Sequence, residues 1–155
     1  LRRQRQMCIR DSNNCVIRTK NVSECWWGFA EPINIASINR KDEIPSGKVK
    51  GLSITNVRCK GEGSIYIAGK DSAPIEDLTL SNIRLELEKT TKYPIKGYDF
   101  RPCCGPDFQE GKINGIYVKN AKNVKAENLE VTVHDNMKEW VDKEICFENA
   151  VVKEK

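Results

Sequence analysis

The chain of 155 residues contains one histidine, His134, and no Cys-x-x-Cys pair. Structural zinc sites take cysteine and histidine ligands at short, regular spacings, so both absences argue against a zinc centre. We predict no metal and no cofactor, and we expect His134 to be an ordinary surface or edge residue. No apolar run approaches the roughly 18 residues that a transmembrane helix requires, so the sequence predicts no membrane span.

Without its first 12 residues, the chain also has no large excess of positive or negative charge. Of the chain's net charge of +4, residues 1–12 contribute four arginines against one aspartate, a net +3, which leaves +1 for the rest. In that remainder, lysine and arginine are interspersed with glutamate and aspartate, as on an ordinary solvated surface. This near-neutral balance removes the electrostatic argument for a nucleic-acid partner.

Residues 1–12 have an unusual origin. From Arg2 to Ser12 they match the in-frame translation of a sequencing adapter and its mosaic end, over eleven consecutive residues. We therefore expect residues 1–12 to be non-native and exclude them from fold reasoning, as a tag would be. On this interpretation the native protein is truncated on its N-terminal side; the alternative is a natural basic arm.

The most informative pattern is a phrase with an asparagine at its centre. It has the form apolar–x–apolar–x–Asn–apolar–x–apolar and returns at intervals of 26, 46 and 21 residues. Its copies are centred on Asn56, Asn82, Asn128 and Asn149, with a further partial copy at Asn14. A phrase that recurs about every 20 to 50 residues is typical of stacked structural units rather than of one globular core.

Each phrase predicts two short strands that meet at a bend. Apolar residues alternate on both sides of the asparagine, but the apolar set shifts by one position across it, since Ile54 and Val57 are three residues apart. The strand must turn there if its apolar face is to stay inward, and asparagine tolerates the left-handed backbone that such a bend needs. Stacked asparagine amides could also hydrogen-bond to one another. Unrelated hairpin turns would not explain why Ile54, Leu80 and Ala126 occupy matching positions.

A second strand phrase falls between the asparagine phrases, with apolar residues two apart, at 32–37, 64–69 and 115–120. Strands that return to the same side after each turn must pair in parallel. We therefore predict an all-β fold, a right-handed parallel β-helix (a solenoid) of about four turns, in which residues 13–155 form the C-terminal part of a single domain. Each turn is expected to hold about three short strands. Loops are expected at 20–30, 38–48, 88–114 and 134–144, and the segment 136–145 allows one short helix.

The cysteines fit this interpretation without a metal. Cys15, Cys59 and Cys146 lie inside strand phrases, where a free thiol packs as a small apolar group. Cys103 and Cys104 are adjacent in a turn bounded by prolines. Because a disulfide between sequence neighbours is strained, we expect these two to be free or separately paired.

The order of the strand phrases, together with two loop motifs, resembles the C-terminal part of glycoside hydrolase family 28, the polygalacturonase-like enzymes. The resemblance covers residues 13–155 and depends most on W-W-G-F-A-E-P-I (26–33) and Y-D-F-R-P-C (98–103) in their places among the strands. It implies an enzyme that hydrolyses O-glycosidic bonds in pectin-type plant polysaccharide with inversion. In such enzymes one carboxylic acid protonates the leaving oxygen while carboxylates opposite it activate water.

The catalytic motifs of that family are absent. They are an Asn-Thr-Asp segment, an Asp-Asp pair and a His-Gly pair on consecutive coils, and none of these strings occurs here. The resemblance therefore implies that the catalytic coils lie upstream, and we expect this chain to contain no catalytic residue and to be inactive alone. The family's Arg-Ile-Lys motif, which grips the substrate carboxylate, aligns with Asn34 and Ala36. A neutral or otherwise decorated sugar is thus as good a candidate as a uronate at that subsite. Arg18 and Lys20 could replace the family's arginine and lysine, but they are weaker candidates because they lie on the preceding strand.

Six residues are candidates for saccharide contact: Trp26, Trp27, Glu31, Tyr98, Asp99 and Arg101. Either tryptophan could stack on a pyranose ring or anchor its loop by burial. Glu31 begins the next strand and is expected to project near the same cleft. Asp99 and Arg101 could contact the sugar or pair with each other to hold their loop.

Two other classes of β-helix protein stay open. One is a non-catalytic rod, such as an adhesin or a tail fibre, and paired aspartates upstream would favour the enzyme over it. The other is a polysaccharide lyase, which needs calcium-binding aspartate clusters that this sequence lacks. The expected partner is a polysaccharide or oligosaccharide, the parent protein is expected to be a monomer, and a secreted or periplasmic location is favoured.

Overall fold

Strands form where apolar and polar residues alternate, because one face of each strand can then pack inward. The computed structural model describes residues 11–24, 28–39, 46–100 and 108–153. The strands are β1 (Asp11–Arg18), β2 (Ile33–Ala36), β3 (Lys50–Gly61), β4 (Ile65–Ala68), β5 (Ile75–Leu87), β6 (Gly97–Asp99), β7 (Phe108–Glu110), β8 (Ile116–Val133) and β9 (Ile145–Val152).

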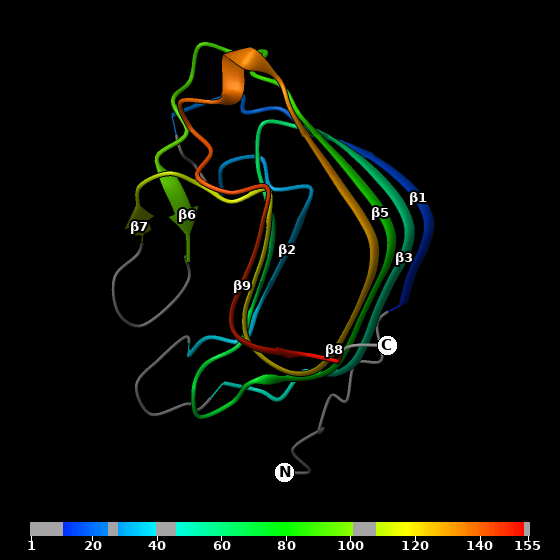
Figure 1. Ribbon diagram of the computed structural model, residues 1–155. Coiled ribbons are helices and arrows are strands. Elements are labelled where there is room, and N and C mark those ends of the chain that lie inside the picture. The colour runs from blue at the N-terminus through cyan, green and yellow to red at the C-terminus, as the bar shows by residue number, and fades with distance from the viewer. Residues whose placement is uncertain (1–10, 25–27, 40–45, 101–107, 154–155) are drawn as a thin grey trace, which may run out of the picture.

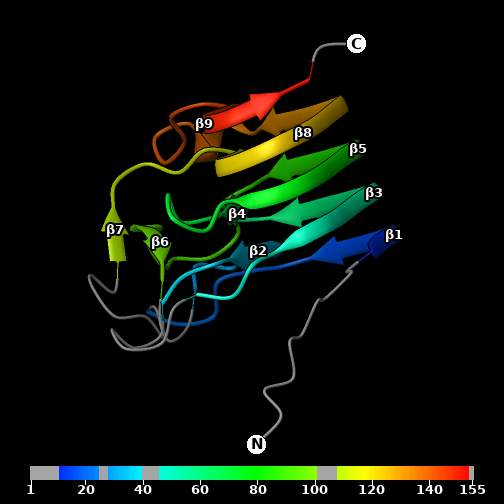
Figure 2. The same ribbon diagram turned by 90° about the horizontal axis from the view of Figure 1, so that it is seen from below.

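Seven of these strands form one curled sheet whose neighbours are all parallel. We call β1, β3, β5 and the second part of β8 the β1 side; they pair in that order (Figure 2). The β2 side consists of β2, β4, the first part of β8, and β9. Figure 1 shows the two sides facing each other across an interior. The all-β class and the parallel pairing are therefore confirmed.

The asparagine column is also confirmed. Asn56, Asn82 and Asn128 all have left-handed backbone, with φ of 53°, 53° and 51°. Each side-chain amide donates to the amide oxygen of the copy before it, over 3.0 Å from Asn82 to Asn56 and 2.7 Å from Asn128 to Asn82. At the N-terminal end Asn14 makes the bend, with φ of 56°, while the neighbouring Asn13 accepts the hydrogen bond from Asn56 over 3.1 Å.

The assignment of Asn149 to this column was wrong. Asn149 lies on the β2 side, where its amide donates to Asn120 over 3.3 Å and not to Asn128. The sequence carried the signal in the match between I-Y-V-K-N-A (116–121) and I-C-F-E-N-A (145–150), which share an asparagine four residues after an isoleucine. That spacing places Asn149 at the end of the second strand phrase, a different corner of the fold from the one at Asn56.

Long strands that bend replace the three short strands expected in each turn. β3 passes through two left-handed residues, Gly51 and Asn56, without losing its pairing to β5. A left-handed residue at the same place in each strand lets neighbouring backbones turn together and keep their hydrogen bonds. Asp77 and Asn123 repeat the bend of Gly51 in β5 and β8, with φ of 55° and 54°.

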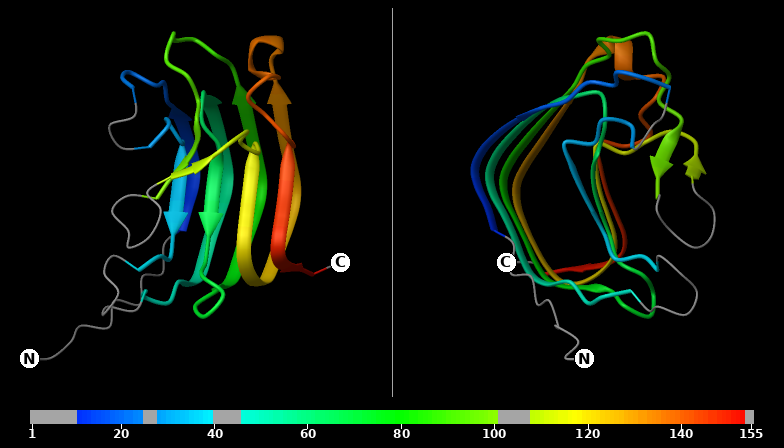
Figure 3. Two further views of the ribbon diagram at one scale, coloured as in Figure 1. Left: turned by 90° about the vertical axis from the view of Figure 1, so that its left-hand side faces the viewer. Right: turned by 180° about the vertical axis from the view of Figure 1, so that it is seen from behind.

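Two loop expectations were wrong in part. The segment 88–114 contains the antiparallel pair β6–β7, which lies outside the β2 side (Figure 3). The segment 136–145 contains no α-helix; instead a single 3-10 turn spans Asp135–Met137, and β9 starts at Ile145. It is the only helical element in the part of the chain that the structure describes.

The core lies between the two sides of the sheet. Ile54 on β3 is opposite Leu80 on β5, and each is at most 1% exposed. On the other side Ile65 and Ile116 are paired across β4 and β8 and are fully buried. Each such side chain contributes about 1.5–3 kcal/mol through burial, so the repeated apolar positions are the main source of stability.

Three cysteines have the role that the sequence predicts. Cys15, Cys59 and Cys146 carry free thiols and pack with the apolar core. Burial raises the pKa of the Cys59 thiol to about 11, so this thiol stays protonated and unreactive at neutral pH. Cys25, Cys103 and Cys104 lie outside the described residues.

A buried carboxylate closes the end of β3. Glu62 is fully buried and accepts hydrogen bonds from Lys89 Nζ at 2.8 Å and from the hydroxyls of Thr90 and Thr91 at 2.6 and 2.9 Å. Burial by itself raises the pKa of Glu62, but these hydrogen bonds outweigh it and hold the pKa below the ordinary value. The segment after β5 is thereby fixed to the end of β3.

The asparagine column can be tested with two substitutions at one position. Asn82→Ala removes the ladder hydrogen bonds and also places alanine in left-handed backbone, so we expect a loss of about 2–3 kcal/mol in the free energy of unfolding. Asn82→Gly removes only the amide and should cost about 1 kcal/mol. Urea denaturation measures both. If the glycine variant matches the wild type, the ladder contributes nothing to stability.

Removing the carboxylate of Glu62 should be more damaging. Glu62→Gln leaves the nearly buried ammonium of Lys89 without its counter-charge, and we expect a loss of about 3–5 kcal/mol at neutral pH. Because the folded pKa lies below the unfolded one, this stabilisation is present above the unfolded pKa and disappears as pH falls through the folded pKa. The difference between variant and wild type should therefore shrink in acid. The double variant Glu62→Gln with Lys89→Met should recover stability; equal loss in both variants would contradict the pairing.

Candidate functional site

An aromatic cluster covers the outer face of the β2 side. Tyr66 on β4 and Tyr117 on β8 are register partners that point outward, with ring centroids 5.8 Å apart. Tyr98 on β6 lies against both, at 4.9 Å from Tyr66 and 5.3 Å from Tyr117. The β6–β7 pair is therefore held to the sheet by contacts between tilted rings, and all three side chains are at least 96% buried.

Two tyrosine hydroxyls at the rim of this cluster have hydrogen-bond partners. The Tyr98 hydroxyl accepts a hydrogen bond from the backbone N–H of Asn114 over 2.7 Å. The Tyr117 hydroxyl donates to Glu148, which also forms an ion pair with Lys119 at 2.7 Å. Hydrogen bonds from Lys119 and Tyr117 lower the pKa of Glu148, so this carboxylate is charged over the physiological range.

Two acidic side chains hold the turn that precedes β2. The backbone N–H of Gly28 donates to Asp99 Oδ2 over 2.7 Å, and that of Phe29 donates to Glu31 Oε2 over 2.7 Å. Successive N–H groups of one turn are thus bound by a carboxylate of the turn itself, Glu31, and by a carboxylate from the distant strand β6, Asp99. The C-terminal part of W-W-G-F-A-E-P-I and the Y-D-F-R-P-C motif meet at this point.

Glu31 is held in an unusual electrostatic environment. Burial raises its pKa, and the nearby charge of Asp99 adds to this rise, while backbone hydrogen bonds oppose it. Its second oxygen, Oε1, is buried and has no hydrogen-bond partner among the described residues. A carboxyl group of this kind takes up a proton more readily than an exposed glutamate, and it can then donate a hydrogen bond.

The backbone of the neighbouring coil fixes the position of Glu31. A Cβ on Gly63 would lie 2.5 Å from the carbonyl carbon of Ala30 and 2.6 Å from the N–H nitrogen of Glu31, so only glycine allows this approach. Thr19 adds a hydrogen bond from its hydroxyl to the Ala30 carbonyl over 2.6 Å. The segment G-E-G-S (61–64) therefore sets the site geometry from the end of β3.

The structure brings together part of the set that the sequence predicts. Glu31 and Asp99 meet at the 28–29 turn, while Tyr98 is a strand residue of β6 and is buried between the β6–β7 pair and the sheet rather than presented on a polar loop. Asn34 and Ala36 are exposed on β2. Trp26, Trp27 and Arg101 lie outside the described residues. Arg18 is on β1, across the interior from β2.

Three contributors were missed by the sequence reasoning: Tyr66, Tyr117 and Glu148. A signal for the tyrosines existed, because S-I-Y-I-A-G and G-I-Y-V-K-N place tyrosine at the same position between two inward isoleucine or valine residues. Alternation predicts that such a residue points outward. What could not be read from the sequence is that the hairpin β6–β7 would cover it.

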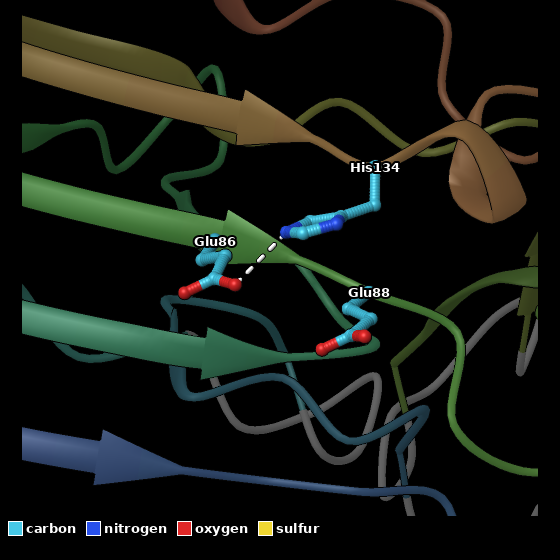
Figure 4. A group of neighbouring side chains, drawn as sticks. All are labelled: Glu86, Glu88 and His134. Atoms are coloured by element: carbon cyan, nitrogen blue, oxygen red, sulfur yellow. Dashed lines mark hydrogen bonds and ion pairs between the residues drawn. The ribbon is translucent and has the colours of Figure 1, made fainter.

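A second cluster lies at the end of the β1 side. Figure 4 shows Glu86 and His134 pointing toward one another, with Glu88 beside them; Glu86 Oε1 and His134 Nε2 are 2.9 Å apart. The three offer ligand atoms within 4.8 Å of one another. However, Lys60 Nζ lies 2.7 Å from Glu86 and 2.8 Å from Glu88 and supplies the positive charge that a cation would bring. We therefore interpret the cluster as an ion-pair network.

No family model, curated protein or solved structure matches the chain. Among the residues that the structure describes, no helix has the length and apolar character needed to cross a membrane. The site must therefore be interpreted from its own geometry.

A substitution at Gly63 tests whether its close contact with the backbone of residues 30–31 fixes the position of Glu31. Gly63→Ala should lower the free energy of unfolding by about 1–3 kcal/mol, because the added methyl meets backbone atoms that cannot move alone. Gly47→Ala is the matched control: its Cβ would meet nothing within 4 Å, and we expect a change within about 0.5 kcal/mol. Equal stability of the two variants in urea titrations would show that the contact is not restrictive.

Proposed function

We propose that this chain is the saccharide-binding, C-terminal part of an enzyme similar to glycoside hydrolase family 28, acting on pectin-type polysaccharide. The observation that carries the proposal is that Asp99 and Glu31 meet at the 28–29 turn, which precedes β2 and its exposed residues Asn34 and Ala36. The two loop motifs on which the resemblance depends are far apart in sequence, yet their acidic residues bind successive N–H groups. A shared site for both motifs is what a sugar-binding cleft requires.

The same proposal extends to the fold. We infer that the described strands form about four turns of a right-handed parallel β-helix. Its support is the parallel pairing on both sides of the interior and the repeated left-handed residues at the bends. Stacked units of this kind present one residue per turn in a straight row on the surface.

Hydrolysis would be performed by residues outside this chain. Inverting cleavage needs a carboxylic acid and a carboxylate set far enough apart to admit water between them. Asp99 and Glu31 are engaged with the backbone of one turn instead, which suits a role in shaping the cleft. We therefore propose that the general acid and base belong to coils not contained in the 155 residues.

A structural rod is the second candidate. Ion pairs between register partners, such as Arg84 with Glu130 and Lys119 with Glu148, reinforce the stack along its length, as a rod would need. A rod does not need a buried and a half-buried carboxylate at a loop junction, which is why we rank it second. Binding of a saccharide at that junction separates the two functions.

The test uses the whole chain and methyl-esterified pectin oligosaccharides, whose carboxylates are masked. We expect the wild type to bind them by calorimetry and to release no reducing ends. Asp99→Asn removes the charge beside Glu31 and should weaken binding by about tenfold, the effect of one lost charged hydrogen bond. Asp135→Asn, which changes an exposed acid on the 3-10 turn, is the control and should bind like the wild type.

Three results would overturn the proposal in different ways. Absence of binding by the folded wild type would favour the rod. Equal binding by both variants would place the sugar elsewhere. Hydrolysis by the purified chain would contradict the assignment of the acid and base to other coils. Thermal unfolding of each variant ensures that only folded protein is compared.

A further inference from the structure

Charged residues on the outside of the sheet follow a rule. Where two of them are register partners on neighbouring strands, their signs are usually opposite: Lys60 faces Glu86 at 2.7 Å, and Arg84 faces Glu130 at 2.8 Å. Lys119 and Glu148 do the same on the β2 side. Opposite signs across strands stabilise a sheet, whereas like signs destabilise it.

Two register pairs break the rule, and both lie in one place. Arg18 on β1 faces Lys60 on β3, and Arg58 on β3 faces Arg84 on β5. The two pairs are adjacent, since Arg58 and Lys60 are two residues apart on the same face of β3. A local conflict of this kind is expected where a sheet is adapted to bind something of the opposite charge.

The surface is hollowed at the same place. One hollow of about 420 Å³ is lined by Asn56, Asn82, Arg58 and Arg84 among others, so it runs along the asparagine ladder. A second of about 560 Å³ is lined by Arg18, Arg58, Lys60 and Arg84 among others. Because Arg58 and Arg84 line both hollows, the two form one groove on the outside of the β1 side, which we call the β1 groove.

Neutralisation of the β1 groove is incomplete. Lys60 is paired with Glu86 and Glu88, and Arg84 with Glu130. Arg18 and Arg58 are exposed and have no acidic partner among the residues that the structure describes. Two guanidinium groups are therefore left to bind an anion, which arginine does with two parallel hydrogen bonds to a carboxylate.

The rest of the lining indicates what else the ligand carries. Each asparagine amide of the ladder uses one N–H and one oxygen lone pair for the hydrogen bonds along the column. Its second N–H and second lone pair can bind a ligand. The amides repeat at the strand spacing, about 4.8 Å, beside the arginines. A row of amides next to guanidinium groups fits an extended molecule with hydroxyl groups and carboxylates.

We propose that the β1 groove binds an acidic oligosaccharide, with a uronate carboxylate held by Arg58 and Arg18 and hydroxyl groups held by Asn56 and Asn82. This site is on the opposite side of the interior from the junction at Asp99, and it does not depend on that junction or on hydrolysis. The chain would thus bind acidic saccharides in the β1 groove, through the carboxylates of the saccharide. It would bind methyl-esterified saccharides at the loop junction of the β2 side.

The experiment titrates the whole chain with unesterified tetragalacturonate. We expect binding that weakens with added salt, and methyl-esterification of the carboxylates should remove the part of the binding that depends on Arg58 and Arg18. Arg58→Gln and, separately, Arg18→Gln should each weaken binding at least about tenfold. Both side chains are exposed and face a like charge, so the variants should unfold at the wild-type temperature or slightly above it. Lys125→Gln removes an equal charge from an exposed position of β8 outside the groove and should leave affinity unchanged.

Defined outcomes would overturn the proposal. It fails if the wild type does not bind tetragalacturonate, or if folded Arg58→Gln and Arg18→Gln bind like the wild type. It also fails if Lys125→Gln loses as much affinity as they do, since attraction would then be nonspecific. Equally tight binding of inorganic sulfate or of a short single-stranded oligonucleotide would replace the saccharide by a general anion. None of these results bears on binding of methyl-esterified ligands at the Asp99 junction.

Discussion

Left-handed backbone at matching rows of successive strands is the constraint on which this structure depends. Most side chains clash in that conformation, and only glycine, asparagine and aspartate adopt it readily. At the two bends of the β1 side such residues recur, as at Asn56 and Asn82 or at Gly51 and Asp77. Since each strand turns at the same row, Ile54 stays opposite Leu80. A slip of one residue would turn every inward side chain outward, so the bends also set the register.

The bends create two outer surfaces with different chemistry. Outward positions of the β2 side carry tyrosines, which a hairpin covers, and the nearby junction is closed by Asp99 and Glu31. Outward positions of the β1 side carry arginines, lysine and amides that stay open to solvent. Because a strand places alternate residues on one face, each surface is built from a few short phrases repeated along the chain. Repetition in the sequence therefore becomes a row of like groups in space.

The sequence predicted what is local and repeated. Alternation around each asparagine was sufficient to place Ile54, Leu80 and Ala126 in one row, and the register confirms it. It failed at Asn149, where two different corners share an asparagine followed by apolar residues. It also could not predict the β6–β7 hairpin, whose stability comes from contacts of Tyr98 with rings on β4 and β8 rather than from its own pattern. Contacts between loops and sheet depend on residues far apart in the chain, and no periodicity records them.

One strand belongs to both sides of the molecule. β8 pairs with β4 before the bend at Asn120 and with β5 from Ala121 onward, and its pairing with β9 runs across that bend, from Ile116 to Val124. Neither side can therefore separate from the other while β8 keeps its hydrogen bonds. The two surfaces are mechanically joined through a single backbone, so thermal opening that reaches β8 must release both faces in one cooperative step.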